Sequence, residues 1–147
     1  MSRELKLPAG DRPLSPVSEL TMPADFRLLG QARELIHSTA LELGFDEAAI
    51  WDIKVAGTEA LANAIEHGTA GDGLIHMRLM PADGELLLEV SGGGKPGEAS
   101  ASSDPRRGRG IAIMSALMDE VALTRDGDAT LLRLAKRLTP SPADVSD

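Results

Sequence analysis

The feature that most constrains the fold is an amphipathic helix predicted over residues 46–68. Apolar residues recur along it at helical spacing, so one stripe must be buried against a neighbouring layer. The members of this stripe are Ile50, Ile53, Ala56, Ala60 and Ala64, joined by Val55, Leu61 and Ile65. On another stripe Glu59, Asn63 and His67 follow one another four residues apart, which places them in one row along the helix.

These three residue types suit phosphoryl chemistry. A neutral amide oxygen such as that of Asn63 can coordinate a Mg²⁺ ion that keeps several waters and is otherwise held by phosphates. The carboxylate of Glu59 can take a proton from a hydroxyl group or a water. Because Glu, Asn and His are also common on solvated helix surfaces, the row gains weight only from the motifs around it.

Two glycine-rich segments follow downstream. Residues 91–95, Ser-Gly-Gly-Gly-Lys, come directly after a predicted strand, and residues 107–114, with Gly108 and Gly110, open a predicted helix. A glycine pair at the start of a helix lets the backbone approach a phosphate, whose charge then faces the positive end of the helix. The second segment therefore predicts a phosphate contact.

The rest of the chain predicts elements in the order β, α, α, β, β, loop, α, β, β. The strands are expected over residues 18–22, 74–80, 85–90, 120–125 and 129–134, and the helices over 24–44, 46–68 and 111–117. Hairpins beside two adjacent long helices predict an α/β two-layer sandwich, with a mixed, mostly antiparallel sheet and the helices on one face. Residues 18–138 form its one domain, between a flexible arm (1–17) and a flexible tail (139–147).

Composition narrows the class of protein further. The chain has no cysteine, which excludes disulfides and thiolate metal sites and suits the cytoplasm. The net charge of −8 argues against a direct nucleic-acid partner. No apolar run approaches the roughly 20 residues that span a bilayer, so we expect no membrane association.

In this order, an asparagine on a helix, a glycine segment after a strand and a glycine-rich helix start resemble the N, G1 and G2 boxes of the GHKL (Bergerat-fold) ATPases. Within them the chain most resembles the anti-sigma factor serine/threonine kinases. The likeness runs over about residues 18–138, and residues 53–68 and 108–121, the latter with Leu-Met-Asp-Glu-Val at 117–121, carry most of it.

The resemblance implies roles for individual residues. Glu59 matches the family's general base and Asn63 its Mg²⁺ ligand, while Thr130 matches a threonine near adenine. The phosphate-binding glycines correspond to Gly108 and Gly110, and Arg109 between them is placed to touch a phosphate or an acidic partner. The implied cofactors are ATP and Mg²⁺.

The first glycine segment departs from the family pattern. The family places an aspartate there that accepts a hydrogen bond from the adenine amino group, but Gly92 stands at that position. Gly94 keeps the first glycine of the box and Pro96 replaces the second. Glu89 does not substitute, because three positions earlier on a strand its side chain points to the other face. Losing a charged acceptor weakens binding by roughly 1.5–3 kcal/mol.

The resemblance implies an anti-sigma regulatory factor that acts by partner switching. It would sequester a sigma factor and alternatively bind a STAS-type anti-anti-sigma factor, which it would phosphorylate on serine with Mg·ATP if nucleotide binding survives Gly92. The open alternative is a nucleotide-free binding module of the same fold. A histidine-kinase catalytic piece ranks last, because no phosphoacceptor helix is evident. We expect a homodimer, formed through a sheet edge or the first strand.

Overall fold

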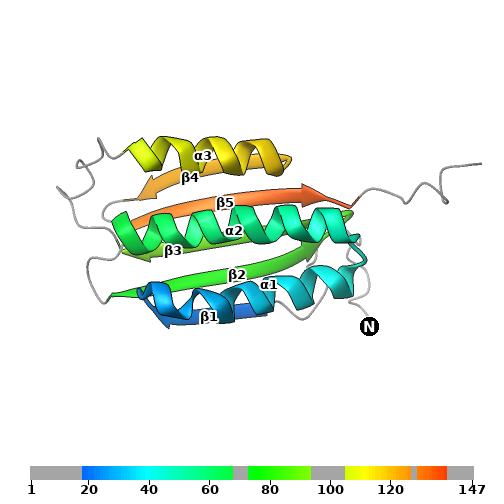
Figure 1. The fold of residues 1–147 in the computed structure, drawn as a ribbon, viewed down its shortest axis with the longest axis horizontal. Helices are drawn as coiled ribbons and strands as arrows, with labels where there is room; N and C mark the ends of the chain where they lie inside the picture. The colour runs from blue at the N-terminus through cyan, green and yellow to red at the C-terminus, as the bar shows by residue number, and fades with distance from the viewer. Residues whose placement is uncertain (1–17, 68–72, 94–104, 127–128, 139–147) are drawn as a thin grey trace, which may run out of the picture.

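The computed structural model describes residues 18–67, 73–93, 105–126 and 129–138, and these form two layers. Three α-helices lie over one face of a five-stranded sheet (Figure 1). The elements in chain order are β1 (Ser18–Pro23), the 3₁₀ turn η2 (Phe26–Leu28), α1 (Leu29–Leu43), α2 (Glu47–His67), β2 (Leu74–Ala82), β3 (Glu85–Gly93), α3 (Pro105–Leu117), β4 (Glu120–Asp126) and β5 (Ala129–Arg137). The predicted two-layer sandwich is confirmed, and the predicted arm and tail lie outside the described residues.

The strand order in the sheet is β1-β2-β3-β5-β4, and every described pair is antiparallel. The last strand therefore lies between β3 and β4 rather than at the edge. In the middle of the sheet Leu88 of β3 pairs with Leu79 on one side and Leu134 on the other, and all three are fully buried. Alternate residues of these strands face the helices and form the aliphatic core.

Short polar side chains and one glycine set the helix ends. Asp46 Oδ1 accepts a hydrogen bond from the Ala49 amide at 2.9 Å and caps α2. The Asp25 carboxylate accepts from Arg27 N and caps the 3₁₀ turn that precedes α1. Hydrogen bonds from Arg27 hold the pKa of Asp25 below its usual range. Gly44 ends α1 with φ of 99°, a conformation that favours glycine.

Two boundaries around the glycine segments differ from the sequence prediction. The strand expected to end at residue 90 continues to Gly93, because Gly92 has a paired neighbour on each side, Ile75 and Thr130. The helix expected from residue 111 begins at Pro105, so Gly108 and Gly110 lie inside its first turns. Proline is favoured at the first helical position, where no amide hydrogen is needed.

Close contact between the two layers depends on a glycine in α2. A Cβ atom at Gly57 would lie 2.7 Å from Ile36 Cδ1 and 3.1 Å from Leu88 Cδ2. Gly57 thus lets α2 approach α1 and β3 at once, which a side chain there would oppose.

The sheet face away from the helices carries a row of alternating charges. Glu19, Arg78, Glu89 and Arg133 follow one another across four paired strands. Arg133 Nη2 lies 2.6 Å from Glu89 Oε2, while Arg78 lies 3.6 Å from Glu19 and 3.8 Å from Glu89. Antiparallel sheets commonly present one such polar face. Of the described helices, none has the length and apolar character required to traverse a bilayer.

Candidate functional site

The site begins where α2 meets α3. Glu59, in the middle of α2, is half-buried, and Gly110 of α3 is buried beside it. A Cβ atom at Gly110 would lie 3.2 Å from Glu59 Oε1, so the carboxylate rests directly against the backbone of α3. The structure therefore joins the predicted base to the second predicted glycine segment, although 51 residues separate them in the sequence.

Asn63 lies one turn further along α2 than Glu59, and it is also half-buried. The Glu59 carboxylate lies against α3, and both residues are partly shielded from solvent. His67 is the last residue of α2, and its side chain lies outside the described part of the structure. The helical row predicted from the spacing is thus present, with its first two members partly enclosed.

Beneath this end of the helices, the sheet brings two further predicted residues together. Gly92 of β3 and Thr130 of β5 are direct partners in the antiparallel register. Gly92 continues the helix-facing series of β3, which includes Leu88 and Val90, so a side chain at position 92 would point toward the helices. Figure 1 shows that the end of α2, the end of β3, the start of α3 and the start of β5 meet at the left of the view.

Glu89 is engaged elsewhere, as its strand position predicts. Its carboxylate accepts hydrogen bonds from Arg133 Nη2 at 2.6 Å and Nε at 2.9 Å on the far face of the sheet. It cannot take the place of the aspartate that Gly92 lacks, because the sheet backbone lies between it and the helices.

Several predicted residues are not fully described. Gly94 and Pro96 lie outside the described residues. Gly108 and Arg109 are placed in α3, and their surroundings lie outside the described part of the structure. Their roles toward a nucleotide stay predictions, as do those of Glu59, Asn63 and Thr130.

The residues present fit Mg·ATP in two respects and depart from it in one. A glycine against Glu59 leaves the α3 backbone open to approach, and Asn63 offers a neutral oxygen. Within the described ranges no group of three or more His, Cys, Asp or Glu is placed to hold a metal ion. A Mg²⁺ held by one amide oxygen, phosphates and waters does not need such a group. The departure is the missing carboxylate at Gly92.

A groove between α1 and α2 adjoins Glu59, and the sequence did not point to it. One cavity of about 310 Å³ is lined by Arg33, Trp51, Lys54, Val55, Thr58 and Glu59. A second cavity, of about 460 Å³, continues past Arg33 and Lys54 to Gly30, Glu34, His37 and Ser38. Both cavities together are called the α1–α2 groove below.

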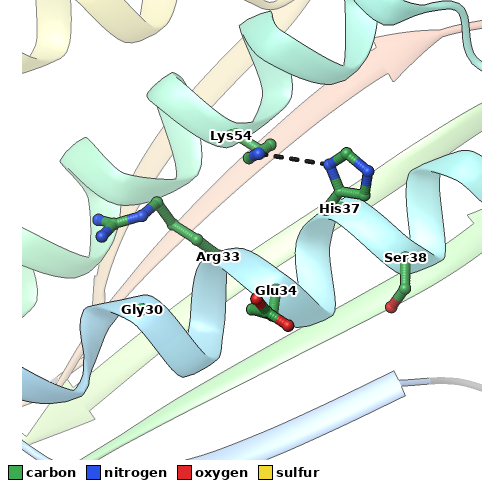
Figure 2. Close-up of a pocket in the computed structure, with 6 residues that line it drawn as sticks. All are labelled: Gly30, Arg33, Glu34, His37, Ser38 and Lys54. Atoms are coloured by element: carbon green, nitrogen blue, oxygen red, sulfur yellow. Dashed lines mark hydrogen bonds between the residues drawn. The ribbon is translucent and has the colours of Figure 1, made fainter.

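The groove is lined by two cations, Arg33 and Lys54, two carboxylates, Glu34 and Glu59, one histidine and one tryptophan. Figure 2 shows Arg33 and His37 turned from α1 toward α2, where Lys54 lies 3.3 Å from His37 Nδ1, while Glu34 and Ser38 turn the other way. Trp51 is the chain's sole tryptophan and 65% exposed. In the sequence, Trp51 stands four residues before Val55 on the predicted helix. This spacing, which places the two side chains in one row, was the signal that could have pointed to the groove. Arg33 and Lys54 are the groups of this lining that attract an acidic ligand, and Glu34 and Glu59 oppose that attraction.

Comparisons with known proteins bear on the family to which the chain belongs. The family model described as the histidine kinase-like ATPase domain matches residues 22–136. The chain belongs to this family. Similar proteins include a serine-protein kinase RsbW of Oceanobacillus iheyensis, 27% identical over 88% of this chain and 91% of the relative. An anti-sigma F factor of Caldanaerobacter subterraneus is 30% identical over 71% of this chain and 82% of the relative.

A solved structure supports the same family membership. The structure of the RsbU and RsbW domains of a Mycobacterium tuberculosis protein matches with a TM-score of 0.70 and 26% identity, over 86% of this chain. This chain spans about a third, 34%, of that longer chain. These comparisons confirm the family and the fold, which were predicted from the asparagine on a helix and the two glycine-rich segments.

Proposed function

We propose that this protein is a cytoplasmic anti-sigma regulatory factor that acts by partner switching. It sequesters a sigma factor and alternatively binds a STAS-type anti-anti-sigma factor, without contacting nucleic acid directly. Support comes from the family membership and from relatives named serine-protein kinase RsbW and anti-sigma F factor. The protein acts as a homodimer, for which β1 offers an edge strand of the sheet.

The catalytic part of the proposal depends on one observation, the contact between Glu59 and the α3 backbone at Gly110. It puts a carboxylate beside the helix whose glycines would lie near the phosphates of Mg·ATP. Glu59 accepts the proton of the partner's serine hydroxyl, and Asn63 offers its amide oxygen to Mg²⁺. Mg·ATP supplies the phosphoryl group. Gly92 and Thr130 lie on the sheet beneath, where the adenine is expected.

The α1–α2 groove is the proposed docking place of the phosphoacceptor segment. A serine that loses its proton to Glu59 must come within hydrogen-bond reach of it, and the groove opens at that residue. Trp51 offers a large apolar anchor, and Arg33 and Lys54 attract acidic side chains that flank the serine. The same surface would then be covered in the complex with the anti-anti-sigma factor.

The alternative, a nucleotide-free binding module, is favoured by one feature only. No described carboxylate on the helix-facing side of the sheet replaces the one missing at Gly92, because Glu89 is bound to Arg133 on the other face. In that case the groove binds its partner but Glu59 moves no proton.

Calorimetric titration of the full chain with Mg·ATP and Mg·ADP separates these two functions. We expect saturable heat, with an affinity weaker by about ten- to a hundred-fold than a site with the aspartate would give. Absence of heat and of a thermal shift at millimolar nucleotide would reject the kinase and leave the module. Replacing Arg33 by Glu should weaken partner binding in either case, and Arg78→Glu on the opposite sheet face is its control.

A further inference from the structure

The Leu-Met-Asp-Glu-Val segment at residues 117–121 stood out in the sequence, yet the proposed site does not use it. In the structure it forms the corner between α3 and β4. The Asp119 amide donates to Ala135 O at 2.8 Å, and Asp119 Oδ2 accepts from the Arg137 amide at 2.6 Å. The Arg137 guanidinium adds a contact of 3.7 Å to the same carboxylate. The corner is thus bound to β5 by both its backbone and its side chain.

Lys136 of β5 ties the end of α3 to α2 as well. Its Nζ donates to Leu117 O at 2.7 Å, which satisfies one of the carbonyl groups that a helix end leaves without a partner. The same Nζ lies 3.3 Å from Asp52 Oδ2 of α2. The Lys136 and Asp52 side chains are 17% and 31% exposed, so this junction of three elements is largely enclosed. We call Asp52, Leu117, Asp119 and Lys136 the C-terminal clamp of α3.

The clamp lies at the C-terminal end of α3, about two turns beyond Gly110, which contacts Glu59 near the middle of the helix. Leu117 and Gly110 are separated by about 10 Å along the helix axis, at about 1.5 Å per residue. A tilt of about 6° at the clamp would therefore shift Gly110 by about 1 Å relative to Glu59. Misplacement of reacting groups by about 1 Å can slow a reaction about a hundred-fold. A change of contacts at the C-terminal end of the helix would therefore be felt at Gly110.

We propose that Lys136 is a positioning residue for phosphoryl transfer, which holds α3 so that Gly110 rests against Glu59. It acts through α3 and does not touch the nucleotide. This inference rests on the proposed kinase function for its catalytic readout. Its structural readout, the order of α3, does not depend on that function.

The test compares Lys136→Met with Arg133→Met in the full chain. Arg133→Met is the control. Arg133 lies on the same strand as Lys136, and its replacement removes an ion pair with Glu89 on the sheet face away from the helices. In Lys136→Met we expect phosphoryl transfer to slow at least about tenfold with a smaller change in KM, because the partner-binding groove is intact. Arg133→Met should keep both values, and Lys136→Arg should restore most of the rate, since its guanidinium can donate to the same acceptors.

Hydrogen exchange gives the second readout. Amides of α3 should exchange faster in Lys136→Met than in the wild type, relative to those of α1, whereas Arg133→Met should leave this ratio unchanged. Asp52→Asn keeps the hydrogen bond from Lys136 to Leu117 O. It should therefore slow phosphoryl transfer and speed the exchange of α3 amides, each by less than Lys136→Met does. This variant replaces Lys136→Met in the test if Lys136→Met does not fold.

The outcomes separate the two proposals. If the wild-type protein binds no nucleotide, the kinase function is contradicted. The hydrogen exchange of α3 amides in Lys136→Met then tests by itself whether Lys136 holds α3 in place. A wild-type protein that transfers phosphate, with Lys136→Met equally fast and equally protected, overturns the positioning role. Equal losses in Lys136→Met and Arg133→Met overturn it too, because they would report only a general loss of stability.

Discussion

Leu88 and Gly92 lie four residues apart on the same strand and face the same helical layer, but they serve opposite purposes. Leu88 is fully buried, lies close beneath Gly57 of α2, and pairs with leucines on both sides. Gly92 has no side chain to pack, and its neighbour on β5 is the half-buried Thr130. Where α2 lies over Leu88, the helix carries the glycine, Gly57, and β3 carries the large residue. Four residues further along β3, the strand itself carries the glycine, Gly92.

The difference shows how one sheet can provide both a stable core and a site. Side-chain volume fills the space between the layers where stability is needed, because buried aliphatic groups contribute about 1.5–3 kcal/mol each. Where the side chains become small, backbone and polar groups come within reach of a ligand. Helix α3 repeats the contrast, with Gly110 against Glu59 near its middle and the clamp at its C-terminal end.

The largest effect is expected at Glu59, the proposed general base. Glu59→Ala should lower the rate of phosphoryl transfer about 10²–10⁴-fold, since a positioned proton acceptor is lost, while Mg·ATP binding is retained. A phosphorylation assay on the proposed STAS-type partner, together with calorimetry, measures both. Glu42→Ala, an exposed acid on α1, is the control. Undiminished transfer would show that Glu59 is not the base.

The core end of β3 is tested by Leu88→Ala. Removing this fully buried side chain should lower the free energy of unfolding by about 2–5 kcal/mol, through lost burial and the cavity left behind. Chemical denaturation measures the loss. At temperatures where the variant is folded, its nucleotide affinity should match the wild type. A matching fall in affinity would mean that the two ends of the strand are not separate.

The site end of β3 is tested by Gly92→Asp. A carboxylate at this position would face the helices beside Thr130 and should tighten adenine nucleotide binding by roughly 1.5–3 kcal/mol, about ten- to a hundred-fold. Gly92→Asn, of similar size without the charge, should gain much less. Unchanged affinity in the Asp variant would show that position 92 does not face the adenine.

The smallest effect is expected at the start of α2, away from both Leu88 and Gly92 of β3. Asp46→Ala removes the acceptor of the Ala49 amide at 2.9 Å and should cost about 1 kcal/mol of stability. Asp46→Asn should be nearly neutral, because asparagine caps a helix about as well. Thermal unfolding measures both. Any change in nucleotide affinity would extend the site further along α2 than the contact of Glu59 with Gly110 indicates.

Much of the fold follows from local patterns. The helical spacing around Ile53 and Ala60, the caps at Asp46 and Gly44, and the Asp-Gly turn at 83–84 predict the elements with small errors at their ends. The segment from 92 to 109 was the exception. Its glycines and charges favour a loop by propensity, but the paired strands on both sides of β3 extend it to Gly93. Neighbouring strands outweigh the low strand propensity of glycine.

The site divides in the same way. The chemical types and their spacing on one helix, Glu59 and Asn63, are properties of the sequence, because a helix fixes which residues share a flank. Four features join segments far apart in the chain: the meeting of Glu59 with Gly110, the pairing of Gly92 with Thr130, the clamp at Lys136 and the groove beside Trp51. Only the packing of α2 and α3 on the sheet, with β5 inserted beside β3, decides such contacts, since no local pattern encodes the neighbours across a layer.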